Sequence, residues 1–168
     1  MSTTSTSTYT YTRTHTAVHL SDTIMASITD ILITLGIDTT RHHRQWDQNS
    51  RAIACWIEEG SLKQVAVECI RPDGATVPVF EFDVNYTAGG MGDRKFTADN
   101  ASLLKYLAKV RSVPAGTTFR LFCSHHGTPS AQPGWTDGTR ASTSGLRARS
   151  IGTLAGAPDA NTTARVHI

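Results

Sequence analysis

Apolar residues first recur at helical spacing within residues 21–35. Ser21-Asp22 is a favourable helix start, and Gly36 is a favourable stop. Between them, apolar residues fall at intervals i, i+4, i+7, i+8 and i+11, which predicts one buried helical stripe. The stripe consists of Ile24, Ile28, Ile31, Leu32 and Leu35.

Two more stretches show the same period. Residues 45–59, ended by Gly60, predict a second helix, and residues 99–111, with Asp99 as the N-cap, predict a third. The expected buried residues are Trp46, Ile53, Trp56 and Ile57 in the second helix, and Leu103, Leu104, Leu107 and Val110 in the third.

Between and after these helices the pattern changes to a period of two, which is typical of strands with one buried face. Residues 65–69 and 77–86 are joined by the turn at 72–74 and predict a hairpin, and residues 118–123 predict a further strand. Residues 9–18, rich in Thr and Tyr, also favour an extended strand. The order predicts an α+β domain with an antiparallel sheet and three main helices on one face.

The last third of the chain, residues 124–168, lacks the density of apolar residues that a core requires. A loop of more than about 15 residues in a compact domain is usually functional or disordered. Here large apolar residues are spaced among glycines and hydroxyls, which suits a segment that wraps over the rest of the domain. These residues are Trp135, Leu146, Ile151, Leu154, Val166 and Ile168.

Composition and length fit one domain of 168 residues: a flexible arm at 1–8, a core at 9–123 and the wrapping segment at 124–168. No apolar run approaches the ~18 residues of a membrane span, and the N-terminus lacks the apolar region of a signal peptide. A cytoplasmic location is therefore expected. Cys55, Cys69 and Cys123 lie in apolar segments and are expected to be reduced core thiols.

Two carboxylates, Glu81 and Asp83, sit at i and i+2 on a predicted strand and could hold Mg²⁺, as in nucleotidyltransferases. Gly60-Ser61 lies upstream, but it follows a helix and precedes a strand, the reverse of the order in those enzymes. A solvated sheet face is favoured instead. Neither a nucleophile elbow nor a phosphate-binding loop occurs, and His42-His43 lacks partners at metal spacing. The sequence predicts no enzyme, metal or cofactor.

Nucleic-acid binding is an alternative for the C-terminal segment. Arg140, Arg147, Arg149 and Arg165 outnumber the acidic residues there, and Trp135 could stack on a base. Four dispersed arginines are nevertheless a sparse electrostatic footprint for this function.

Several short motifs occur together in an order that resembles the bacterial HORMA-domain proteins. The C-terminal motifs are GWTDG at 134–138, ST at 142–143, SGL at 144–146 and SIG at 150–152. The N-terminal ones are the Tyr- and Thr-rich start at 9–15, SD at 21–22 and the R-A-I-x-x-W-I pattern at 51–57. The resemblance covers nearly the whole chain.

This resemblance implies a HORMA-like fold and a peptide-binding adaptor in place of an enzyme. Its C-terminal segment would be a safety belt that closes over the closure-motif peptide of a partner protein. In the closed state such proteins bind and activate a CD-NTase, a cyclic-oligonucleotide synthase of CBASS anti-phage defence. An AAA+ ATPase reopens them, and some operons encode a second HORMA protein, which would be a further partner.

The residues expected to form the peptide site lie on the belt and on the strand before it. The peptide would add to the exposed edge of residues 118–123, which includes Phe119 and Leu121. Trp135, Leu146 and Ile151 would anchor the belt, and Gly138, Gly145 and Gly152 would let it turn. The ATPase would grip the arm at Met1, Ser2, Thr3 and Thr4.

Overall fold

The computed structural model describes residues 3–87 and 95–168, with side chains described from Arg13 onward. The helices are α1 (Thr3–Leu35), α2 (Thr40–Arg44), α3 (Trp46–Glu58) and α4 (Ala101–Leu107). The strands are β1 (Leu62–Ile70), β2 (Thr76–Tyr86), β3 (Thr97–Ala98), β4 (Thr118–His125), β5 (Ala148–Gly156) and β6 (Ala160–His167).

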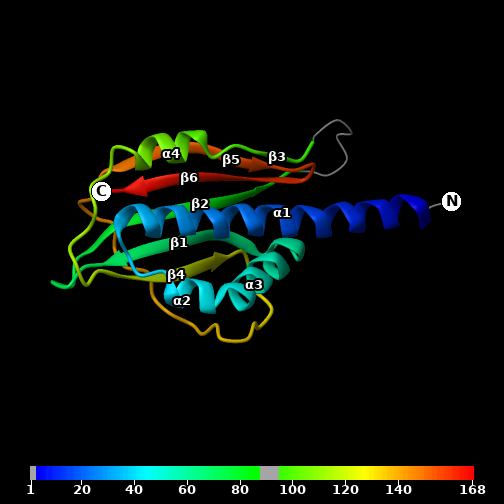
Figure 1. The fold of residues 1–168 in the computed structure, drawn as a ribbon. Helices are drawn as coiled ribbons and strands as arrows, with labels where there is room; N and C mark the ends of the chain where they lie inside the picture. Colours follow the sequence, from blue (N-terminus) through cyan, green and yellow to red (C-terminus); the bar gives the residue numbers. More distant parts are fainter. Residues whose placement is uncertain (1–2, 88–94) are drawn as a thin grey trace.

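The strands form one antiparallel sheet in the order β3-β5-β6-β2-β1-β4. Helix α1 runs across the sheet, with α4 beside it above β5 and α3 beside it above β4 (Figure 1). None of the described helices lies on the other face, which we call the open face. The predicted α+β architecture, an antiparallel sheet with its helices on one face, is confirmed.

The core lies between the helices and the sheet. All five apolar residues of the predicted first stripe are fully buried, and so are Phe80 and Phe82 of β2 opposite them. The segment Arg13–Leu35 is long and apolar enough to cross a membrane, but half of it is buried inside the fold. Its hydropathy is that of a core helix.

The predictions for the N-terminal region are wrong in two respects. Residues 9–18 are not an extended strand but part of α1, and Ser21-Asp22 lies inside this helix instead of capping it. Tertiary contacts override the strand propensity of the threonines. Thr16, Ala17 and Leu20 are buried. Asp159 accepts a hydrogen bond from Thr16 Oγ1 at 2.5 Å and forms an ion pair with Arg13 at 2.9 Å.

The other predicted elements are confirmed, with shorter ends for α4. The hairpin pairs β1 with β2, and β4 pairs with the other side of β1. Leu103 and Leu107 are buried, whereas Leu104 is exposed. The N-cap of α4 is Asn100 and not Asp99 as predicted, although Asp99 accepts a hydrogen bond from the Ala101 N–H at 2.9 Å. A loop predicted at 89–92 lies outside the described residues.

The C-terminal segment contains two strands that the sequence pattern did not predict. β5 and β6 form a hairpin, and β6 pairs with β2 along its whole length. Leu154 and Val166 belong to the buried core, so the core does not end at Cys123. This hairpin anchors the end of the wrapping segment to the sheet.

The three cysteines are free thiols, as expected. Cys69 is buried, and burial raises the pKa of its thiol to about 12. Cys55 and Cys123 are only half-buried.

Candidate functional site

The segment from His126 to Arg147, which we call the crossing segment, connects β4 to the C-terminal hairpin. In Figure 1 it is drawn in yellow to orange and passes along the α2–α3 side of the molecule. It starts on the helix face, goes around the outer edge of β4 and continues onto the open face. Its contacts on each side define this path.

On the helix face, the crossing segment is held by α3 and the residue after it. The indole Nε1 of Trp56 donates to the backbone carbonyl of Ser130 at 2.8 Å. The backbone N–H of Ser130 donates to Glu59 at 3.1 Å. A hydrogen bond from Ser61 opposes the effect of burial and helps to lower the pKa of Glu59, and Ser130 adds to this. The carboxylate is therefore charged where it holds the segment.

Trp135 marks the point at which the crossing segment turns towards the edge of the sheet. Its ring packs edge-on against Trp56, with ring centroids 5.3 Å apart. Before it, Gly134 has φ +79°, and a Cβ at this position would lie 2.1 Å from Gln48 Nε2. Glycine thus allows both the left-handed backbone and the close approach to α3.

The outer edge of β4 has no neighbouring strand in the described sheet. Between this edge and the crossing segment is a cavity of about 580 Å³, which we call the edge groove. One wall is formed by Leu121, Phe122, Cys123 and His125 of β4 together with Trp56, and the other by residues 128–132 and 135–138. The crossing segment therefore encloses a strand edge that is unpaired among the described residues.

Two polar atoms at this groove are buried without a hydrogen-bond partner: Nε1 of Trp135 and Nε2 of His125. His125 packs edge-on against Trp56 at 4.5 Å, and burial lowers the pKa of its imidazole. Unpartnered buried polar atoms are costly and rare in native folds. The groove thus combines an aromatic wall with unused hydrogen-bonding capacity.

The groove continues past Trp135 into a second cavity of about 180 Å³ at the start of β4. Leu121 and Trp135 line both cavities. The second cavity also contains Arg41, whose guanidinium lies over the Phe119 ring at 4.4 Å. Within residues 13–87 and 95–168, no carboxylate forms an ion pair with Arg41. One end of the groove is aromatic and the other is cationic.

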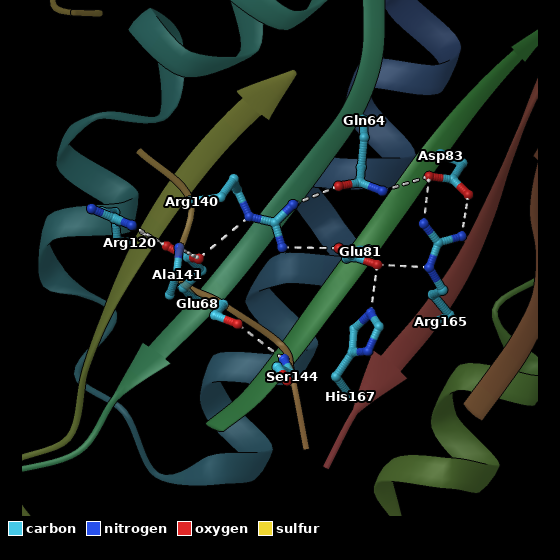
Figure 2. A network of polar contacts seen from close by, with 11 residues as sticks. Gln64, Glu68, Glu81, Asp83, Arg120, Arg140, Ala141, Ser144, Arg165 and His167 are labelled. Atoms are coloured by element: carbon cyan, nitrogen blue, oxygen red, sulfur yellow. Dashed lines mark hydrogen bonds and ion pairs between the residues drawn. The ribbon is translucent and has the colours of Figure 1, made fainter. Parts of the chain in front are cut away.

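On the open face, Arg140 attaches the crossing segment to three residues of β1 and β2 (Figure 2). Its guanidinium donates to Gln64 at 2.7 Å, to Glu81 at 2.9 Å and to Glu68 at 3.3 Å. Glu68 is completely buried and also accepts the backbone N–H of Ala141 at 2.8 Å. We call this arrangement the arginine latch.

The latch extends to β6 through Glu81, which corrects the prediction of a solvated face. Glu81 is 6% exposed and contacts Arg165 and His167, both at 2.6 Å. Burial alone would raise the pKa of Glu81, but hydrogen bonds from His167, Arg140 and Arg165 lower it to about 2. Asp83 pairs with Arg165 as well.

These pairings leave little support for a metal site at Glu81 and Asp83, because arginines occupy their oxygens. Among the residues described, no group of three or more His, Cys, Asp or Glu side chains could hold a metal ion. The same ion pairs weaken the nucleic-acid alternative for the C-terminal segment. Two of its four arginines, Arg140 and Arg165, are paired with Glu81 and are not free to contact phosphates.

The structure brings four of the expected belt and edge residues together. Phe119, Leu121 and Trp135 line the groove, and Gly138 lies against Phe122 at its far side. The remaining four lie elsewhere: Gly145 and Leu146 beyond the latch, and Ile151 and Gly152 on β5. Of the expected ATPase contacts, Met1 and Ser2 lie outside the described residues, and Thr3 and Thr4 begin α1.

Sequence reasoning missed Trp56 as part of the groove and missed the latch residues Gln64, Glu68 and Arg140. Trp56 had the pattern of a core residue. Glu68 alternates with apolar neighbours just as a solvent-exposed residue would. The only available signal was an arginine inside an otherwise uncharged, glycine-rich stretch.

Solved structures share this fold at low sequence identity, which establishes the fold alone. A chain of a mitotic checkpoint complex has a TM-score of 0.74 at 9% identity, covering 92% of this chain and 95% of that chain. C. elegans HTP-2 bound to the HIM-3 closure motif has a TM-score of 0.59 at 16% identity, covering 78% of this chain and 71% of that chain. A chain of the E. coli MS115-1 CdnC:HORMA-deltaN complex has a TM-score of 0.60 at 13% identity, covering 90% of this chain and 86% of that chain.

No curated protein matches the sequence. The family model described as bacterial HORMA domain 2 matches residues 3–164, which include α1, the sheet, the crossing segment and most of the C-terminal hairpin. The chain therefore belongs to the bacterial HORMA domain family.

Proposed function

We propose that this protein is a non-catalytic adaptor that binds an extended peptide in the edge groove, beneath the crossing segment. The observation that carries this proposal is the unpaired β4 edge enclosed by a chain that is attached on both faces of the sheet. A peptide that adds to this edge gains backbone hydrogen bonds, and the cavities select its side chains.

The two ends of the groove suggest the chemistry of the peptide. A bulky apolar side chain fits the wall formed by Trp56, Trp135 and His125. An acceptor on the peptide would satisfy the orphaned Nε1 of Trp135. An acidic residue suits the end at Arg41. Because the two ends are separated along β4 and a strand rises only about 3.3 Å per residue, these two anchors would lie several residues apart in the motif.

Two of the similar structures support this mode of binding. HTP-2 is bound to a closure motif in its structure, and the E. coli chain comes from a complex of CdnC and a HORMA protein. We propose by analogy that the peptide-bound form of this protein binds and activates a CD-NTase in CBASS defence. A second HORMA protein is a candidate source of the peptide.

Peptide selection tests the proposal directly. Peptides selected from a random library on the intact protein should share an apolar and an acidic position. Trp135→Ala should weaken their binding by about tenfold or more, since burying a large apolar side chain contributes roughly 1.5–3 kcal/mol. Trp46→Ala is the matched control, because Trp46 is a half-buried tryptophan of the same helix region that does not line the groove.

Hydrogen exchange gives a second readout. Addition of peptide should protect the amides of the crossing segment, and moderate salt should not reverse binding, in contrast to a phosphate-dependent ligand. Selection of no peptide, or equal binding by the wild type and Trp135→Ala, would exclude the edge groove as the site.

We further propose that an AAA+ ATPase opens the belt after gripping the N-terminal residues, including Met1–Thr4. Deletion of residues 1–8 should leave peptide binding intact and prevent ATP-dependent release of the peptide. Unchanged release by the deletion variant would contradict this part of the proposal.

A further inference from the structure

A separate cavity lies on the helix face, at the opposite edge of the sheet from the edge groove and the cavity next to it. It has a volume of about 230 Å³ and sits between α4 and β5. We call it the basic pocket. It is lined by Ser102, Lys105, Tyr106, Lys109, Arg149, Ser150 and Ile151.

The charged side chains that line the basic pocket are all positive. Lys105 lies on α4, and Lys109 follows four residues later in the turn after this helix; both side chains line the pocket. Arg149 reaches the pocket from β5. No Asp or Glu lines it, and no ion pair within the described residues involves any of these three cations.

Other cations reinforce the positive potential here. Residues 101–111 and 147–156 contain five Lys or Arg and no acidic residue, although the whole chain has a net charge of only +2. By contrast, Arg140 and Arg165 on the open face are neutralised by carboxylates. The basic pocket therefore gathers several cations that no carboxylate neutralises.

Arg149 is positioned by an aromatic ring instead of a carboxylate. Its Cζ lies 5.3 Å from the centroid of the Tyr106 ring, a cation–π contact that orients the guanidinium and leaves its full charge available. Burial raises the pKa of Tyr106, more than the charge of Arg149 lowers it, so its hydroxyl stays protonated at neutral pH. Ser102 and Ser150 supply two more hydroxyls.

We infer that the basic pocket binds the phosphate group of a nucleotide or of a nucleic-acid backbone. Arginine forms paired hydrogen bonds with phosphate oxygens, lysines add point charges, and hydroxyls donate to the remaining oxygens. This site is separate from the proposed peptide function, because β5 and β4 are separated in the sheet by β6, β2 and β1. Both ligands can therefore be bound together.

Binding to the intact protein is measured by calorimetry with pyrophosphate, ATP and a short single-stranded oligonucleotide as separate probes. At least one should bind. Tighter binding of the oligonucleotide with increasing length identifies a backbone ligand, and binding of ATP or pyrophosphate without that gain identifies a free phosphate compound. Polyglutamate tests for charge alone and should not compete.

Arg149→Glu should lower the affinity for the probe that binds by about tenfold or more, because it removes one of three cations and adds an anion. Lys105→Gln should have a smaller effect in the same direction. Arg51→Glu is the matched control, since Arg51 is an exposed arginine of α3 outside the pocket. Thermal melting checks that each variant is folded.

Three results would overturn the inference: no binding of any of the three probes, equal weakening by Arg149→Glu and Arg51→Glu, or displacement of the probe by polyglutamate. The peptide selection described above is independent of all three, so failure of one proposal leaves the other standing.

Discussion

The two halves of the last third of the chain are held to the same sheet by different interactions. The C-terminal hairpin pairs with β2 from Ala160 opposite Tyr86 to His167 opposite Val79, and it places Leu154 and Val166 in the core. The crossing segment contains no strand and only half-buried large apolar residues. It is held by Trp135, by Ser130 and by the arginine latch.

This difference predicts which part can move. Regions with few buried apolar contacts open locally at low free energy, whereas core strands open only with global unfolding. The crossing segment should therefore release a peptide while the hairpin stays attached to β2. Such a division lets a belt open without loss of the fold.

The largest expected effect is in the hairpin. Leu154→Ala removes a side chain that is 1% exposed, and such truncations cost about 2–5 kcal/mol. The loss should appear in the free energy of unfolding of the whole domain, measured by denaturant titration. Leu146→Ala, a half-buried leucine of the crossing segment, is the control and should cost much less. Equal losses would mean that both halves belong to one cooperative unit.

The sequence predicted the parts of the fold that depend on local pattern. The stripe from Ile24 to Leu35 and the alternation in β2 need no knowledge of distant residues. The start of α1 could not be predicted, because its threonines favour strands. The contacts that favour a helix there are the hydrogen bonds that Thr16 and Arg13 donate to Asp159, which is far along the chain. β5 and β6 were missed because half of their buried residues are alanines and only Leu154 and Val166 are large and apolar.

The candidate site was predictable only in outline. The β4 edge and Trp135 follow from the strand pattern and from the resemblance to the family. The latch does not, because Glu68 and Arg140 are far apart in sequence, and the isolated arginine does not indicate which residues it contacts. A buried carboxylate on an alternating strand looks the same as an exposed one until its partner is located.

The next largest effect is expected at the latch. Arg140→Met keeps an unbranched side chain but removes the donors to Gln64, Glu68 and Glu81. Loss of hydrogen bonds to charged groups costs roughly 1.5–3 kcal/mol, moderated here because both carboxylates keep other arginine partners. Amides of residues 138–144 should exchange more than tenfold faster, while those of β6 stay protected.

Arg147→Met is the control for Arg140→Met, because Arg147 is exposed and its backbone pairs with Ile168, the residue after β6. It should leave the exchange of residues 138–144 unchanged. If Arg140→Met also leaves it unchanged, the latch does not hold the crossing segment.

A smaller effect is expected at the point where the crossing segment touches α3. Gly134→Ala places a Cβ on a residue with φ +79° and against Gln48, at a cost of about 1–2 kcal/mol. Gly145→Ala has a similar φ of +83° but no atom within 4 Å, so it isolates the backbone contribution. Peptide affinity should fall further with Gly134→Ala, and Gln48→Ala should restore part of the difference.

The smallest effect is a pH dependence that originates at Glu81. Its pKa is lowered from 4.5 to about 2, so its contribution to stability is complete above pH 4.5 and is lost as the pH falls towards 2. Roughly 1 kcal/mol of that contribution is expected to be lost by pH 4. Glu81→Gln removes the titrating group while keeping its size. Exchange of residues 138–144 should therefore accelerate between pH 5 and pH 4, after correction for intrinsic rates, in the wild type but not in Glu81→Gln.

Glu81 contacts both Arg140 of the crossing segment and Arg165 of β6. The same acidification should nevertheless loosen the end of β6 near His167 less than the crossing segment, because β6 is also held by strand pairing and the crossing segment is not. Equal acceleration of both regions would show that Glu81 supports the hairpin as much as the belt, and the contrast between the two halves would then fail at this residue.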